Sequence, residues 1–100
     1  MRLVVRDAAE ADILEAARWY EARSLGLGHE FLRAVDVTLA EIARMPERYP
    51  LVRGTVRRAL LRRFPYAVFF VATADFVSVL ACMHARRDPR RWQERAGPDR

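Results

Sequence analysis

The chain has 100 residues, of which 52% are apolar and 31% charged, which predicts one small domain with a real core and excludes a disordered segment. All 18 basic residues are arginines, against 13 acidic residues, and the net charge is +5. The one cysteine, Cys82, excludes an intrachain disulfide and a cysteine-based zinc site, and it fits a reducing compartment.

Charge is divided unevenly between the two halves. Residues 1–50 hold seven arginines and nine acidic residues, whereas residues 51–100 hold eleven arginines and four acidic residues. A basic half on a small domain predicts an anionic partner, either nucleic acid or an acidic protein segment. The first residues lack the apolar run of a signal peptide, so a cytoplasmic location is expected.

A strand over 1–6 and a helical hairpin over 8–44 are the first elements expected. Asp7 and Glu10 have the spacing of a capping box, with Asp7 accepting the early backbone N–H groups. Apolar residues then recur with helical period over about 8–23 and again over about 29–44, where Pro46 ends the pattern. Gly26 and Gly28 mark the connection between the two helices.

Segments over 55–64, 66–72 and 76–83 predict three strands within a sheet region at 51–85; the last two are almost wholly apolar, whereas the first carries several arginines. Asp75 interrupts the apolar stretch from Phe64 to Ala85, which favours a β-hairpin over a membrane span. Short connections predict antiparallel pairing, so we expect an α+β fold with the helical hairpin on one face of a small, mainly antiparallel sheet. The residues expected to meet in the core are Phe31, Val35, Leu39 and Ile42 from the helices, and Val68, Phe70, Val77 and Val79 from the strands.

Residues 86–100 are predicted to form a basic C-terminal tail, in which Asp88-Pro89 opens a short turn or helix. The arginines of the second half outnumber its acidic residues, which predicts a contact surface. Arg62, Arg63 and Arg86 are expected at one end of the sheet with His84 and Trp92, because the strand that starts at Tyr66 pairs with the one that ends at His84. The candidate binding surface comprises Arg58, Arg62, Arg63, His84, Arg86, Arg87 and Trp92.

His84 has two interpretations that the sequence leaves open. As a strand-terminal histidine it would bond the backbone or Asp88, and as a general base it would serve nucleic-acid cleavage. In the second case Arg62 and Arg86 would stabilise the phosphorane, so the candidate catalytic residues are His84, Arg62 and Arg86. No metal site and no cofactor are expected, because the two histidines lie far apart in sequence and the Gly26-Leu27-Gly28 run has Phe31 where a nucleotide fingerprint has its third glycine.

Several short motifs follow one another along residues 1–95 at characteristic spacings. They are Asp7-x4-Asp12 leading to Trp19-Tyr20-Glu21, Leu27-Gly28-x2-Phe31, Met45-Pro46, Arg62-Arg63-Phe64-Pro65-Tyr66 followed by Val68-Phe69-Phe70, and His84-x-Arg86-Arg87-Asp88-Pro89-x2-Trp92. In this order they resemble the RelE/ParE-type toxins of type II toxin–antitoxin systems. The last motif is the most specific and resembles the ParE-like branch.

The resemblance implies two N-terminal helices on a twisted, mainly antiparallel sheet. It also implies a toxin–antitoxin hetero-oligomer, in which a cognate antitoxin wraps the toxin with an acidic or amphipathic C-terminal segment. ParE-like members poison DNA gyrase without a recognised hydrolytic centre, whereas RelE-like members cut mRNA on the ribosome.

The chain departs from the nuclease branch of the family that it resembles, because members of that branch carry a set of lysines and arginines with a tyrosine near the C-terminus. This chain has no lysine, and Trp92 stands where the tyrosine is expected. An indole N–H cannot shuttle a proton near neutral pH. The sequence therefore favours a gyrase-directed toxin that acts by binding, with a ribosome-dependent endoribonuclease and an inactive relative that only binds its antitoxin as the alternatives.

Overall fold

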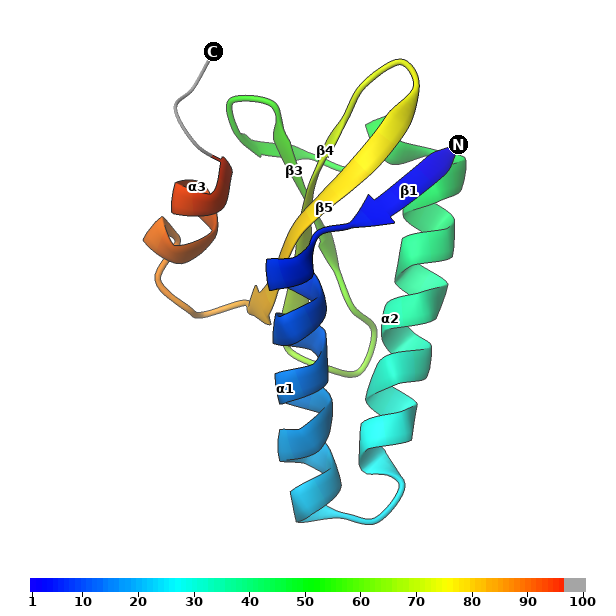
Figure 1. Ribbon diagram of the computed structural model, residues 1–100, viewed down its shortest axis with the longest axis vertical. Coiled ribbons are helices and arrows are strands. Elements are labelled where there is room, and N and C mark those ends of the chain that lie inside the picture. The colour runs from blue at the N-terminus through cyan, green and yellow to red at the C-terminus, as the bar shows by residue number, and fades with distance from the viewer. Residues whose placement is uncertain (97–100) are drawn as a thin grey trace.

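The computed structural model describes residues 1–96, which form a five-stranded sheet with helices on both faces (Figure 1). In chain order the elements are β1 (Arg2–Val5), α1 (Asp7–Arg23), α2 (Leu27–Arg44), the 3-10 helix η1 (Pro46–Arg48), β2 (Leu51–Arg53), β3 (Val56–Leu60), β4 (Tyr66–Ala72), β5 (Phe76–His84) and α3 (Arg90–Ala96). No helix in this described range combines the length and apolar character needed to cross a bilayer.

The strand order is β1-β5-β4-β3-β2, and every neighbouring pair is antiparallel except β1 with β5. The α+β fold with a mainly antiparallel sheet is therefore confirmed. The sheet has two strands more than the three that the consecutive segments over 55–83 predicted, for two reasons. The N-terminal strand crosses back to pair with the last strand, and a turn at Gly54, with φ of 53°, adds the short strand β2 before β3. The expected strand over 55–64 ends at Leu60.

The expected capping box at the start of α1 is wrong. Arg6 is the N-cap residue, and no side chain caps the helix. Arg6 is still extended, and its N–H donates to Val79 O over 3.1 Å, so the sheet positions this helix start. Asp7 instead lies in the first turn, where a carboxylate favours the helix dipole.

The helix α2 begins at Leu27, two residues before the expected start, because α1 caps it. The Glu21 carboxylate accepts hydrogen bonds from the backbone N–H groups of Gly26 and Gly28, each at 2.9 Å. Gly26 adopts a φ of 89°, which a glycine reaches without the steric cost that other residues carry. These two bonds lower the pKa of Glu21 below its ordinary value.

The lowered pKa of Glu21 predicts a pH-dependent contribution to stability. Since the folded-state pKa lies below that of the unfolded chain, the contribution is present above the ordinary glutamate range and is lost as pH falls through the folded value. We expect the wild type to resist urea better than Glu21→Gln at pH 7, and the gap to close below the ordinary glutamate pKa. A gap that stayed constant from pH 7 to pH 3 would contradict this role of the carboxylate.

Gly28 lies at a close approach of α2 to the backbone of α1. A Cβ atom at this position would stand 2.6 Å from the backbone oxygen of Ala17. We expect Gly28→Ala to lower the free energy of unfolding by about 1–2 kcal/mol. The overpacking cost of about 1–3 kcal/mol exceeds the gain in helix propensity of about 1 kcal/mol, because a backbone carbonyl cannot rotate away. Urea denaturation measures this, with exposed Arg33→Ala as the control; a midpoint at or above the wild type for Gly28→Ala would contradict the close approach.

The core between the helical hairpin and the sheet matches the sequence prediction. Seven of the eight predicted residues are buried there, and Leu39 is half-buried against them. The opposite face of the sheet holds a second apolar cluster that includes Phe69, Leu80 and Met83. The segment expected as a basic tail covers this cluster, since Trp92 of α3 is only 6% exposed and stacks on Phe69 at 4.5 Å. Residues 97–100 of that expected tail lie outside the described residues.

A β-bulge interrupts the pairing of β4 with β5. Phe70 pairs with Val79 and Phe69 pairs with Ala81, so Leu80 is an extra residue on β5. The bulge reverses which alternate residues face the hairpin: Val79 lies in the helix-side core, and after the bulge Cys82 does, although the two are three positions apart. By the same alternation His84 is turned toward the helices.

Candidate functional site

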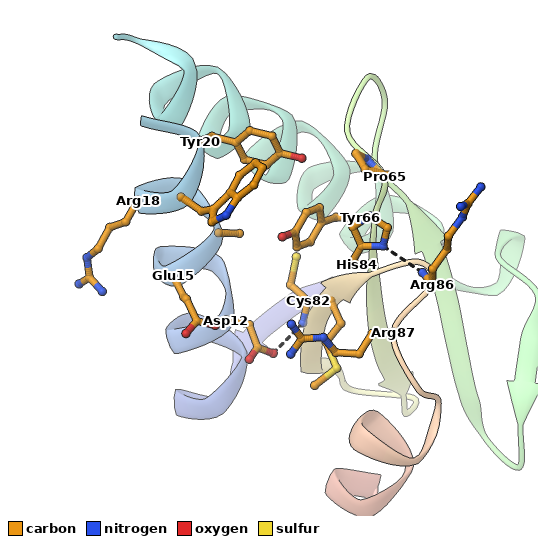
Figure 2. A pocket seen from close by; sticks show the side chains of 13 residues that line it. Asp12, Glu15, Arg18, Tyr20, Pro65, Tyr66, Cys82, His84, Arg86 and Arg87 are labelled. Carbon is orange, nitrogen blue, oxygen red and sulfur yellow. Dashed lines mark hydrogen bonds between the residues drawn. The ribbon is translucent and has the colours of Figure 1, made fainter. Parts of the chain in front are cut away.

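A cleft of about 1030 Å³ opens between α1, the start of β4 and the end of β5 (Figure 2). Its lining combines the aromatic side chains of Trp19, Tyr20 and Tyr66 with charged side chains of both signs, and the contributing residues include Asp12, Glu15, Arg18, His84, Arg86 and Arg87. The helix brings Trp19 and Tyr20, the hairpin of β4 and β5 brings Tyr66 and His84, and the turn after β5 brings the two arginines. The cleft therefore depends on both halves of the chain.

The aromatic side of the cleft is continuous with the core. Tyr20 and Tyr66 lie with their ring centroids 6.0 Å apart, and both contact Phe31, at 5.4 and 5.2 Å. The ring of Tyr66 lies beside that of His84, with centroids 5.5 Å apart (Figure 2). Such edge-to-face and stacked arrangements fix the ring positions, so the cleft has a preorganised apolar wall.

Three groups of the cleft hold their protons firmly. Burial raises the pKa of the Tyr20 and Tyr66 phenols above the ordinary value, and burial together with Asp12 raises the pKa of the Cys82 thiol to about 12. A general base has to lose its proton near neutral pH to accept another, and a nucleophilic cysteine has to be a thiolate. These side chains can therefore donate hydrogen bonds but do not serve as bases or nucleophiles.

His84 is held by the backbone of the turn that follows it. Its Nδ1 accepts a hydrogen bond from the Arg86 N–H at 3.1 Å, as the dashed line in Figure 2 marks. A nitrogen that accepts this bond carries no proton, so the neutral ring has its proton on Nε2. Of the two interpretations of His84, this geometry matches the strand-terminal histidine, with a backbone N–H as partner and not Asp88. The ring nitrogen left free is a donor.

Arg86 and Arg87 stay available as cations at the mouth of the cleft. The nearest acidic residue in sequence, Asp88, is occupied by Arg90, whose Nε and Nη2 donate to it at 3.0 and 2.7 Å. These bonds lower the pKa of Asp88. Within residues 1–96, neither Arg86 nor Arg87 takes part in an ion pair. Guanidinium groups in this state can hold carboxylates or phosphates.

The remaining predicted site residues lie elsewhere, so the expected cluster of Arg62, Arg63, His84, Arg86 and Trp92 is wrong. Arg63 pairs with Glu30 at 2.6 Å and Arg62 with Glu41 at 3.8 Å, so both turn toward α2, where they line a separate groove of about 330 Å³. Trp92 is buried against Phe69, because the indole is the one large apolar side chain that α3 can place on the sheet. Arg58 is exposed on β3.

Trp19 is one of several residues of this site, with Tyr20 and Tyr66, that the set of candidates omitted. Its side chain is 50% exposed, packs edge-on against Tyr20 at 5.1 Å, and carries the Arg23 guanidinium 3.9 Å above its ring. The sequence contained a signal for this, because Trp19 lies outside the apolar stripe of its helix. A large apolar side chain in that position is expected to be exposed and so available for binding. No three His, Cys, Asp or Glu side chains among residues 1–96 lie close enough to hold a metal ion.

The model of the family described as the ParE toxin of type II toxin–antitoxin systems, parDE, matches residues 3–89. The chain belongs to the ParE toxin family. A solved structure described as the chromosomal ParDE TA system from P. aeruginosa is similar in fold, with a TM-score of 0.70 and 18% sequence identity over 84% of this chain and 95% of that chain. Among curated proteins none matches this sequence.

Membership of the ParE family confirms the resemblance found in the sequence motifs. The matched range contains the whole lining of the cleft, from Asp12 to Arg87, and ends before α3 begins at Arg90. The cleft is thus made from the part of the chain that resembles the ParE toxins, while α3 lies beyond it.

Proposed function

We propose that this ParE-family toxin acts by binding: it inhibits DNA gyrase in the cytoplasm, and a cognate antitoxin neutralises it by covering the cleft between α1 and β5. The observation that carries the proposal is the chemistry of the cleft. It offers Arg86 and Arg87, which form no ion pair with any of residues 1–96, and exposed aromatic surface, but its phenols and thiol keep their protons and the Nδ1 of His84 is occupied.

Arginines and a tryptophan are the side chains that most often dominate protein–protein binding energy. An acidic or amphipathic antitoxin segment would place carboxylates on Arg86 and Arg87 and an apolar side chain on Trp19. Such a segment would occlude the cleft from any other partner. The toxin and antitoxin would form a hetero-oligomer in which the cleft is buried.

Induction of the toxin in cells tests the mechanism. We expect filamentation and a DNA-damage response while translation continues, and we expect the purified toxin to inhibit supercoiling by gyrase. Coexpression of a cognate antitoxin should restore growth. Early arrest of translation with cleaved mRNA would overturn the proposal in favour of an endoribonuclease, and normal growth on induction would indicate a relative that only binds its antitoxin.

A further inference from the structure

Beyond the end of β1, an ion pair provides the hydrogen-bond partners for the backbone at the edge of β5. The last backbone hydrogen bond at this edge joins the N–H of Arg6, which follows β1, to Val79 O at 3.1 Å. Beyond it, the Leu80 carbonyl accepts from Arg95 Nη1 at 3.3 Å, and the Cys82 N–H donates to Asp12 Oδ2 at 3.0 Å. Asp12 comes from α1 and Arg95 from α3, so two helices supply the partners that a longer β1 would otherwise provide.

Asp12 and Arg95 also bind each other through two contacts. Arg95 Nη2 donates to Asp12 Oδ1 at 3.1 Å, and Nη1 donates to Oδ2. The two side chains are 15% and 28% exposed, so the pair is partly shielded from water. A bidentate arginine–carboxylate pair of this kind has a defined geometry as well as a favourable energy.

The pair stands at the bulge that decides which way His84 points. Leu80 is the extra residue of the bulge, and Cys82 is the first residue after it that faces the helix-side core. If β5 continued from Val79 without the bulge, alternation would turn Cys82 and His84 to the face that α3 covers. The ring of His84 would then leave Tyr66, and the arginines that follow would emerge from a different place.

We propose that Asp12 and Arg95 are positioning residues of the cleft: by bonding the main chain on both sides of Ala81, their ion pair holds the bulge and so places His84 and the arginines after it. Their importance for binding rests on the proposed function of the cleft, whereas their effect on the register of β5 does not. The proposal also gives α3 a role in a site to which it contributes no lining residue.

The test compares Arg95→Ala with Ile42→Val in the full chain, purified with its antitoxin and separated for NMR. Ile42→Val is the control for general stability, because it weakens the helix-side core at α2 but leaves α3 and both partners of the bulge in place. We expect Arg95→Ala to accelerate hydrogen exchange of the Cys82 amide by at least about tenfold and to abolish the nuclear Overhauser contact between Tyr66 and His84. Ile42→Val should lower the melting temperature and keep both signals.

Arg95→Lys should partly restore both signals, because an ammonium group can still pair with Asp12. Unchanged signals in Arg95→Ala, or their equal loss in Ile42→Val, would overturn the positioning role, because Arg95 would then have no effect on the bulge beyond general stability. Antitoxin affinity is measured in parallel. A shifted register with wild-type affinity and toxicity would leave the positioning role standing and count against the proposed function of the cleft.

Discussion

Trp19→Ala is expected to weaken antitoxin binding about thirty-fold and to relieve growth inhibition. An exposed tryptophan in a cleft that arginines also line has the character of a binding hot spot, for which truncation costs about 2 kcal/mol or more, and about 1.4 kcal/mol corresponds to tenfold in affinity. The ring is half exposed, and its contacts are the edge of Tyr20 and the guanidinium of Arg23. Calorimetry with the purified antitoxin, and colony counts after induction, measure the two effects.

Leu14→Ala supplies the control for this experiment. Leu14 belongs to the same helix and has a similar exposure, 42%, but does not line the cleft. We expect it to bind and to inhibit growth as the wild type does. Wild-type affinity and toxicity in Trp19→Ala, or equal losses in both variants, would remove the cleft from the binding surface.

Phe31→Ala is expected to leave the isolated toxin unfolded or insoluble. Phe31 is fully buried and contacts Tyr20, Phe64 and Tyr66 with centroids between 5.2 and 5.4 Å. Truncation of such a ring costs about 3–5 kcal/mol, against a total stability of about 5–15 kcal/mol for a domain. A chain of this length lies toward the lower end of that range, because small domains bury a smaller fraction of their surface.

The antitoxin should rescue Phe31→Ala. A partner that binds only the folded toxin adds about 4 kcal/mol when its free concentration is 1,000-fold above the dissociation constant. We therefore expect soluble protein on coexpression and little without it, compared with exposed Val37→Ala on the same helix, which should behave as the wild type. A melting temperature for isolated Phe31→Ala within a few degrees of the wild type would show that this ring does not hold the hairpin on the sheet.

The helical hairpin and its core were predictable because their signal is local. Apolar residues with helical period and a proline stop define α2 within 18 residues, and the central strands β4 and β5 are almost wholly apolar. The direction in which His84 points was not predictable, because it depends on a bulge that leaves no local signal in the sequence. Since β5 is covered on both faces, apolar residues occupy both sets of alternate positions, and no change in pattern marks Leu80 as the extra residue.

The distribution of the arginines depended on partners that are distant in sequence. Arg63 pairs with Glu30 and Arg95 pairs with Asp12, at sequence separations of 33 and 83 residues. A count of nearby acidic residues therefore could not identify which guanidinium groups are paired. Trp92 was expected at a binding surface because a flat apolar ring among arginines is common in binding hot spots. One apolar ring on a short basic helix is, however, enough to dock that helix on Phe69.

The parallel pairing of the first strand with the last has a consequence for synthesis of the toxin. Residues 2–5 can join the sheet only after residues 76–79 have been synthesised. Until β4 and β5 have left the ribosome, the helical hairpin of α1 and α2 has no sheet on which to bury its apolar side. Long-range pairing of this kind slows folding. The cleft also needs α1 and the end of β5, so a nascent or truncated chain lacks it. We therefore expect a ribosome that stalls before codon 84 to release a harmless fragment, and toxicity to arise only with an almost complete polypeptide.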